Sequence, residues 1–216
     1  MARIIGIEKL TLREMIRNFH LYYGLPDGLA DLPCPATITI GKKEYHVPTT
    51  MDELADSICY GQRLYMARQE ENDIQLIMRM MRGYYYPLIT SQKWDEQKSL
   101  LIQNNILTCT AKDLYPVTMH FVKLISEIAD RERKLLHRAP TKMELAAGIE
   151  KLNVFSELNS LDFLRDAMKC DILEVLQTPY NECLVRFLNA KEIADYQERY
   201  YKLQKEEYEA KSKYKK

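Results

Sequence analysis

The sequence predicts a mainly α-helical protein, a helical bundle with one small β-hairpin and a long C-terminal helix. Three observations predict this fold class. From residue 50 onward, apolar residues recur three and four positions apart, which is the spacing of one helix face. Residues that cap helices recur along the same stretch. One short stretch before it alternates apolar and polar residues, as strands do.

The N-terminal part predicts a helix, a loop and the hairpin. Helical spacing runs from Leu12 to Tyr23, with Thr11 as its cap. A loop rich in proline and glycine follows. Residues 36–47 then alternate around Gly41-Lys42, which predicts two strands joined by a type II′ turn. A lone hairpin is marginally stable in water, so we expect this one to lean on helices or to pair with a neighbouring subunit.

The middle of the chain predicts a series of helices that supply the core. Their starts are marked by capping residues and their ends by glycine or proline. They are one opened by Thr50 and running past Tyr65, one from Glu71 to Tyr84 that stops before Pro87, one after Trp94, one from Pro116 to His137, one from Thr141 to Gly148, and one from Ser160 to Leu176.

The last predicted helix begins at Thr178-Pro179 and changes character along its length. Up to Leu188 it has a broad apolar face, and after Lys191 only a narrow stripe remains. We therefore expect a helical body, residues 1–190, and a projecting helix, residues 191–216. A narrow stripe on a charged helix suits a partner helix, and the alternative is that it folds back onto its own domain. The stripe consists of Ile193, Tyr196, Tyr200 and Leu203.

Composition and charge restrict the classes of function. The 216 residues are 46% hydrophobic and 29% charged, as in a folding globular protein with a core of its own. Lys plus Arg and Asp plus Glu number 31 each, so the formal net charge is zero. This argues against a protein devoted to nucleic-acid binding, which needs excess positive charge. It weakly favours assembly, because self-repulsion is absent.

The cysteines and the N-terminal segment indicate a protein made in the cytosol. The five cysteines are widely spaced, odd in number and without a C-x-x-C pair, so we expect free thiols rather than a zinc site or a disulfide framework. The first residues reach charged side chains too soon for a signal peptide. No apolar run approaches the length that crosses a membrane.

Catalytic and cofactor-binding patterns are missing from the sequence. It has no P-loop, dinucleotide fingerprint, zinc-protease motif or nucleophile elbow. Asp162 and Asp166 lie four apart beside Arg165, which is more typical of a solvated helix face than of a metal site. The run Tyr84-Tyr85-Tyr86 indicates core or interface packing rather than base stacking, because no basic groove accompanies it. We expect no enzymatic activity, no cofactor and no metal.

Several short motifs resemble those of small helical proteins from the structural modules of tailed phages. The motifs there are a Y-x-V-P strand, a helix containing [FY]-G-Q and a helix ending in Y-x-P. The segments LYPVTMHFVKLISEI and MELAAGIEKLNVFSELNSLDFLRD are similar to proteins encoded with the virion genes of crAss-like phages of gut Bacteroides. The resemblance covers about residues 10–200, and none of its motifs is catalytic. The matching residues here are Tyr45, Val47 and Pro48; Tyr60, Gly61 and Gln62; and Tyr84 to Pro87.

The resemblance implies a virion structural protein, made in the host cytoplasm, that forms an oligomeric ring or head–tail adaptor in the neck. It implies as partners copies of the chain and the portal or other neck and tail proteins. It implies no membrane and no specific nucleic acid, beyond passive contact with DNA in transit. An auxiliary capsid protein and a tail-assembly chaperone are nearby alternatives. A helical nucleic-acid-binding or regulatory protein is an alternative of another class.

The predicted hairpin and projecting helix favour a ring, and they carry the residues that we expect at protein interfaces. A cyclic assembly joins one face of each subunit to a different face of the next. A hairpin can extend a neighbour's sheet, and a detached helix can clamp an adjacent ring. The interface residues that we expect are Tyr45 and Val47 on the hairpin, and Ile193, Tyr196, Tyr200 and Leu203 on the projecting helix.

Overall fold

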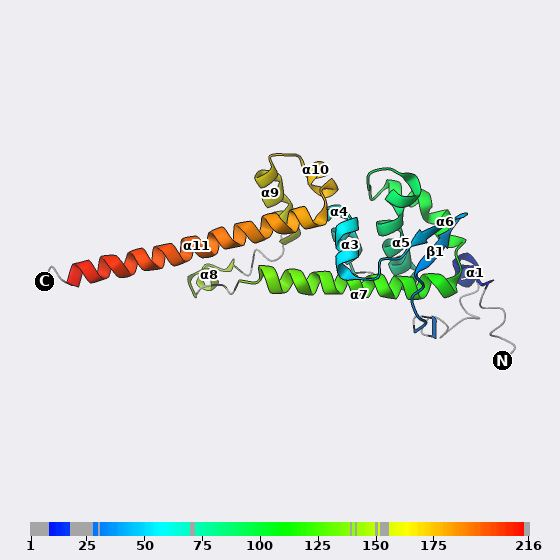
Figure 1. Cartoon of the computed structure of the whole chain (residues 1–216), viewed down its shortest axis with the longest axis horizontal. Coiled ribbons are helices and arrows are strands. Elements are labelled where there is room, and N and C mark those ends of the chain that lie inside the picture. Colours follow the sequence, from blue (N-terminus) through cyan, green and yellow to red (C-terminus); the bar gives the residue numbers. More distant parts are fainter. Residues whose placement is uncertain are drawn as a thin grey trace.

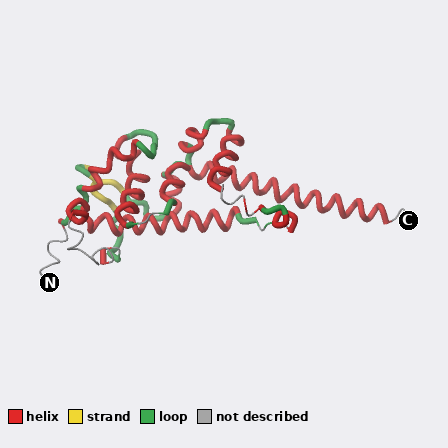
Figure 2. Tube along the Cα trace, turned by 180° about the vertical axis from the view of Figure 1, so that it is seen from behind, coloured by secondary structure: helices red, strands yellow, loops and turns green. Residues whose placement is uncertain are grey.

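A computed structural model of the chain describes residues 9–17, 28–29, 31–69, 72–138, 140, 142–149, 151 and 156–213. It confirms the predicted fold class, because the described residues form helices and one two-stranded hairpin (Figure 1). The molecule is elongated, with α1 and the hairpin at one end and the tip of α11 at the other (Figures 1 and 2). The helices are α1 (Leu12–Arg17), α3 (Met51–Ser57), α4 (Tyr60–Ala67), α5 (Asp73–Thr90), the 3-10 helix η3 (Lys98–Ile102), α6 (Gln103–Leu107), α7 (Ala111–Leu136), α8 (Lys142–Ala146), α9 (Ser156–Met168), α10 (Ile172–Gln177) and α11 (Tyr180–Lys213).

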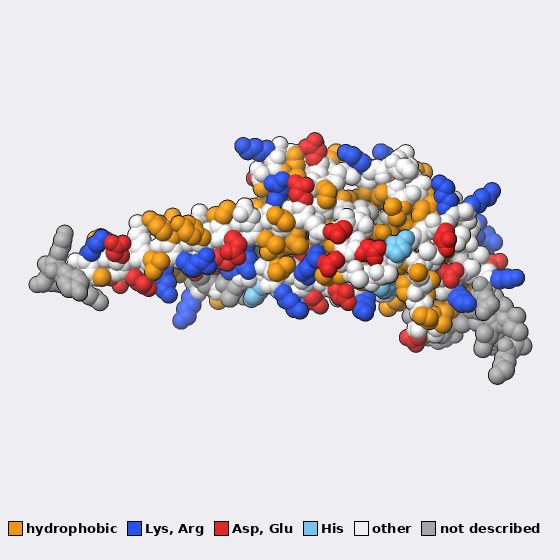
Figure 3. Space-filling model, viewed as in Figure 1, with side chains coloured by type: hydrophobic (Ala, Val, Ile, Leu, Met, Phe, Trp, Pro, Cys, Tyr) orange, Lys and Arg blue, Asp and Glu red, His pale blue; other side chains and the backbone are white. Residues whose placement is uncertain are grey.

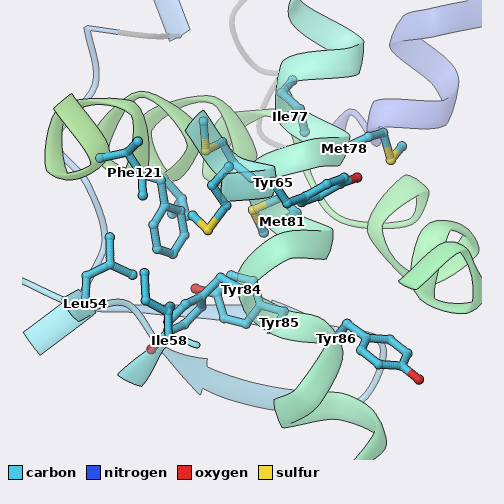
Figure 4. Close-up of a cluster of buried hydrophobic side chains, with 14 of the residues drawn as sticks. Leu54, Ile58, Tyr65, Ile77, Met78, Met81, Tyr84, Tyr85, Tyr86 and Phe121 are labelled. Carbon is cyan, nitrogen blue, oxygen red and sulfur yellow. The ribbon is translucent and has the colours of Figure 1, made fainter. Parts of the chain in front are cut away.

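The core of the body is centred on α5 and α7. Tyr84, Tyr85 and Tyr86 are all buried on α5, and Phe121 of α7 packs against the first two (Figure 4). The ring centroids of Tyr84 and Tyr85 are 4.9 Å apart in an edge-on arrangement. Aromatic pairs of this kind contribute roughly 0.5–1.5 kcal/mol beyond their burial. Core packing, rather than an interface, therefore accounts for the tyrosine run.

Helix α5 continues through Pro87, so the prediction that it stops before this residue is wrong. Proline has no N–H, which leaves the carbonyl of Gly83, four residues earlier, without its helical donor. The buried side chain of Gln62 donates from Nε2 to this carbonyl oxygen at 2.6 Å. The helix ends instead at Thr90, and the residue that follows it, Ser91, has a φ of 57° in the left-handed region.

The helix expected to run from Thr50 past Tyr65 is divided into α3 and α4. Thr50 caps α3 as predicted, because its hydroxyl accepts a hydrogen bond from the Glu53 N–H. Ile58 then becomes extended and its carbonyl accepts a hydrogen bond from the Tyr180 N–H at 3.0 Å. This hydrogen bond joins the break between α3 and α4 to the first turn of α11. The prediction of one continuous helix is wrong because the spacing of apolar residues does not encode such a tertiary hydrogen bond.

Other helix boundaries also differ from the prediction. The helix expected from Ser160 is two helices, α9 and α10, and Asp171 caps the second. Helix α7 begins at Ala111 and includes Pro116 in its second turn. The expected continuation of α1 beyond Arg17, and the expected cap at residue 141, lie outside the described residues.

The hairpin consists of β1 (Thr37–Ile40) and β2 (Lys43–His46), paired antiparallel with Ile38 opposite Tyr45. Gly41 has a positive φ of 68° and Lys42 does not, which is the sign pattern of the predicted type II′ turn. Ile38 is buried, and the ring of Tyr45 lies 5.9 Å from that of Tyr85 on α5. The hairpin therefore packs against the helices of its own chain.

Candidate interaction surface on the C-terminal helix

Helix α11 begins inside the body and leaves it. Tyr180, Cys183 and Leu184 in its first two turns are buried. From Tyr196 to Lys211 every residue is exposed. In Figures 1 and 2 this second half extends past the end of α7. We call residues 196–213 the tail of α11.

The predicted stripe lies on the exposed side of α11. Figure 3 shows hydrophobic side chains gathered along the edge of this helix that points away from α7. The rings of Tyr196 and Tyr200 stack with their centroids 6.2 Å apart. The exposed fractions are 49% for Ile193, 60% for Tyr196, 52% for Tyr200 and 65% for Leu203.

The stripe faces away from the body. Each residue turns an α-helix by about 100°, so the position of one side chain around the axis fixes the others. The side of α11 that faces the body is marked by Lys191, whose Nζ donates to the Leu135 carbonyl, and by Glu198, which pairs with Arg138 at 3.2 Å. The stripe is centred about 180° from this side. It does not fold back onto its own domain, as the alternative interpretation required.

Two further exposed apolar groups on α11 lie outside the predicted stripe. Val185 is exposed and falls on the same side of the helix as the stripe, two turns before Ile193. Tyr201 and Tyr208 are seven residues apart and lie on a different side of the tail. The angle of each side chain around the axis of α11, measured from a residue that faces the body, shows which group belongs to which side of the helix. The sequence alone does not identify that residue.

The two expected interface residues on the hairpin are placed differently. Val47 is only 1% exposed and belongs to the core, so the prediction that it contacts a partner is revised. Its N–H donates to the Ala36 carbonyl at 3.0 Å, which extends the hairpin ladder. Tyr45 is half-buried against Tyr85 and keeps part of its ring at the surface. The structure thus brings none of the hairpin residues close to the stripe on α11.

A cavity of about 390 Å³ opens between α4, α7, α9 and α11. Arg63 and Glu132 on its wall neutralise one another through a two-point ion pair. Leu184 and Phe187 supply apolar wall. Among its described lining residues there are serines but no histidine that could activate one. A serine with a histidine beside it is therefore not found among these described residues.

Several titratable side chains are either buried or paired with a side chain of opposite charge. Burial raises the pKa of Cys109 to about 11 and that of Cys183 to about 12, so both thiols stay protonated and poorly nucleophilic near neutral pH. All five cysteines are free. His46 lies 2.6 Å from Glu53, and Arg165 pairs with both neighbouring aspartates on an exposed helix face.

The described part of the chain contains no group of three His, Cys, Asp or Glu side chains arranged to hold a metal. Among the same residues, no helix has the length and apolar character needed to cross a membrane. Comparison of the chain with protein-family models, with curated proteins and with solved structures finds no match.

Proposed function

We propose that this chain is a structural protein of a tailed-phage virion, which assembles with copies of itself into a ring or adaptor in the head–tail neck. The observation that carries the proposal is the exposed apolar stripe on the face of α11 opposite the body. A stripe that cannot reach its own core is typical of a surface that another chain covers.

The stripe is large enough to hold a partner helix. A fully buried aliphatic or aromatic side chain contributes roughly 1.5–3 kcal/mol relative to an exposed one. Tyrosine supplies much of the area here, and it loses little conformational entropy when it is buried at an interface. The four stripe residues are between 49% and 65% exposed, so a large part of this contribution is still available to association.

The proposed location in the head–tail neck rests on the resemblance of this chain to phage structural proteins. Two of its residues, Gln62 and Pro87, join α4 to α5 in this chain, because Gln62 donates to the Gly83 carbonyl that Pro87 leaves without a helical donor. The zero net charge supports an assembly protein over a nucleic-acid-binding one.

The proposal is tested by incorporation into particles of the phage that encodes the chain. We expect Tyr196→Asp with Tyr200→Asp to leave the body folded and to remove the chain from purified particles, because two charges replace the centre of the stripe. Lys202→Asp is a matched control, since it changes the net charge by the same amount on another side of the tail. The measurement is immunodetection in purified particles, with circular dichroism to check folding.

Two outcomes would contradict the proposal. If the wild-type chain is missing from particles and instead co-purifies with a tail protein, it is an assembly chaperone. If the double variant is incorporated as fully as Lys202→Asp, the stripe is not the docking surface.

A further inference from the structure

The cavity between α4, α7, α9 and α11 has the size and the mixed lining of a site for a small ligand. Its volume of about 390 Å³ lies within the range of roughly 300–1,000 Å³ that is typical of ligand pockets. Such pockets combine an apolar wall with a few fixed polar groups. Both kinds of group are present here, and each restricts the chemistry of the ligand that fits.

The main polar feature of the wall is the ion pair between Arg63 and Glu132. Nε and Nη2 of Arg63 donate to the two carboxylate oxygens. Its third nitrogen, Nη1, carries two more N–H donors, and each carboxylate oxygen can accept a further hydrogen bond. Both side chains line the cavity and keep 14% and 19% of their surface exposed. The wall therefore offers a donor and an acceptor to the same ligand.

The lining carries no net charge that would attract an ion. Burial raises the pKa of Tyr60 and that of Tyr180 to about 12, so both phenols stay neutral near neutral pH. The charged lining residues outside the ion pair, Arg68 and Glu157, are exposed and of opposite sign. An ionic ligand would lose its hydration without gaining a counter-ion, because the two members of the ion pair already neutralise one another.

The apolar side of the cavity contains an aromatic cluster. The ring centroids of Tyr60 and Phe187, which both line the cavity, are 6.1 Å apart at a tilt of 49°. Phe187 also stacks on Phe163 of α9 at 5.4 Å. A further ring can join such a cluster in an offset or edge-on arrangement. Leu64 and Leu184 add aliphatic surface to the same lining.

We propose that this cavity binds an uncharged ligand that joins an aromatic ring to an amide group. The amide supplies an acceptor for Arg63 and a donor for Glu132 within one neutral group. The ring packs against Tyr60 and Phe187. This chemistry is found both in free aromatic amides and in phenylalanine residues of polypeptides. The inference is independent of the assembly through α11 proposed above.

Matched ligands test the amide and the absence of charge. Phenylacetamide, phenylacetate and phenethylammonium share a phenyl ring on a methylene group and differ in the polar end. We expect the full-length chain to bind phenylacetamide at least tenfold more tightly than either ion. N-acetyl-phenylalaninamide adds a second peptide group and distinguishes the sources: tighter binding than phenylacetamide indicates a polypeptide, and weaker binding indicates a free small molecule. Ligand-detected NMR titration measures each dissociation constant.

Three variants locate the ligand and its polar partners. Ala67→Phe adds a ring at an exposed position of the lining and should weaken phenylacetamide binding at least tenfold. Asn159→Phe is the matched control, because it adds the same ring on an exposed part of α9 outside the lining. Glu132→Gln leaves Arg63 without its counter-charge, so this variant should prefer phenylacetate to phenylacetamide. A general loss of stability would not reverse the preference, and circular dichroism checks that each variant is folded.

Four results would overturn the proposal. Equal affinity for phenylacetamide and the two ions would mean that the polar wall does not select the ligand. Unchanged binding by Ala67→Phe would place the ligand elsewhere on the chain. A preference for the amide that persists in Glu132→Gln would remove the ion pair from recognition. If none of the four ligands binds at millimolar concentrations, the ligand class is wrong. None of these results changes the outcome of the particle assay on the stripe of α11.

Discussion

Four residues join the Tyr60-Gly61-Gln62 motif on α4 to the motif on α5 that ends at Pro87. Pro87 removes the donor for the Gly83 carbonyl, and Gln62 replaces it. A Cβ on Gly83 would lie 2.6 Å from Cγ of Met66, so its absence allows α4 to approach α5. The motifs can be read from the sequence, but the hydrogen bond between them cannot. That bond depends on which backbone carbonyl of α5 the Gln62 side chain of α4 reaches in the folded protein.

Substitution of Gln62 tests this link. We expect Gln62→Ala to lower the free energy of unfolding by about 1–3 kcal/mol, because the buried Gly83 carbonyl loses the side-chain donor that replaces its helical one. Adding Pro87→Ala restores a backbone N–H to Gly83 and should recover part of the loss. Pro87→Ala alone is the control for the double variant. Urea denaturation of the three variants gives the coupling free energy between Gln62 and Pro87. If the two single changes in unfolding free energy add up to the change in the double variant, the link between the two residues is contradicted.

Glu53 gives the folded state a dependence on acid. The Thr49 N–H, donating to its carboxylate, is the main cause that lowers the pKa of Glu53, and His46 adds to it. Because the pKa is lower when folded, the stabilisation is complete above the unfolded value near ~4.3 and is lost as pH falls through the folded value. Glu53→Gln should therefore weaken the decline in stability as the pH falls below about 4.3. Thermal unfolding measures it, with Glu206→Gln on the tail as control; equal pH profiles for the two variants would contradict the assignment.

At the scale of elements, local signals predicted the hairpin, the cap at Thr50 and the long last helix. Each is encoded by neighbouring residues: a Gly-X turn, a hydroxyl before an acidic first turn, and a continuous run without glycine. The errors occurred where a distant segment decides the outcome. Ile58 leaves the helix to bond with Tyr180, and α5 passes through Pro87 with help from α4. Tertiary hydrogen bonds of this kind leave no mark in helical spacing.

The tail of α11 should form a stable helix only when another chain covers it. It is exposed from Tyr196 to Lys211, and most of the stability of a helix in a protein comes from packing of its apolar face. We expect amides from Tyr196 to Lys211 to exchange with solvent far faster than those from Asn181 to Ala190 in dilute protein. They should become protected when the chain associates. Hydrogen exchange read by mass spectrometry measures both states. Strong protection of the tail in the monomer would contradict this view.

The whole molecule divides its residues between a self-sufficient body and an unpartnered helix. The expected boundary near residue 190 lies within α11 itself, because the first turns of that helix complete the core and its later turns contact little else. The stripe could be predicted from spacing. Its direction could not, because the ion pair between Arg138 and Glu198 that orients it joins segments sixty residues apart. Val47 shows the converse error, since a residue at the open end of the hairpin was taken for an interface residue and belongs to the core.

The mass of the full-length chain in solution, measured by light scattering across a concentration series, tests self-assembly most directly. The account predicts a discrete species several times heavier than the 25.5 kDa monomer, which Tyr196→Asp with Tyr200→Asp converts to monomer. A wild-type chain that remains monomeric at every concentration would contradict it.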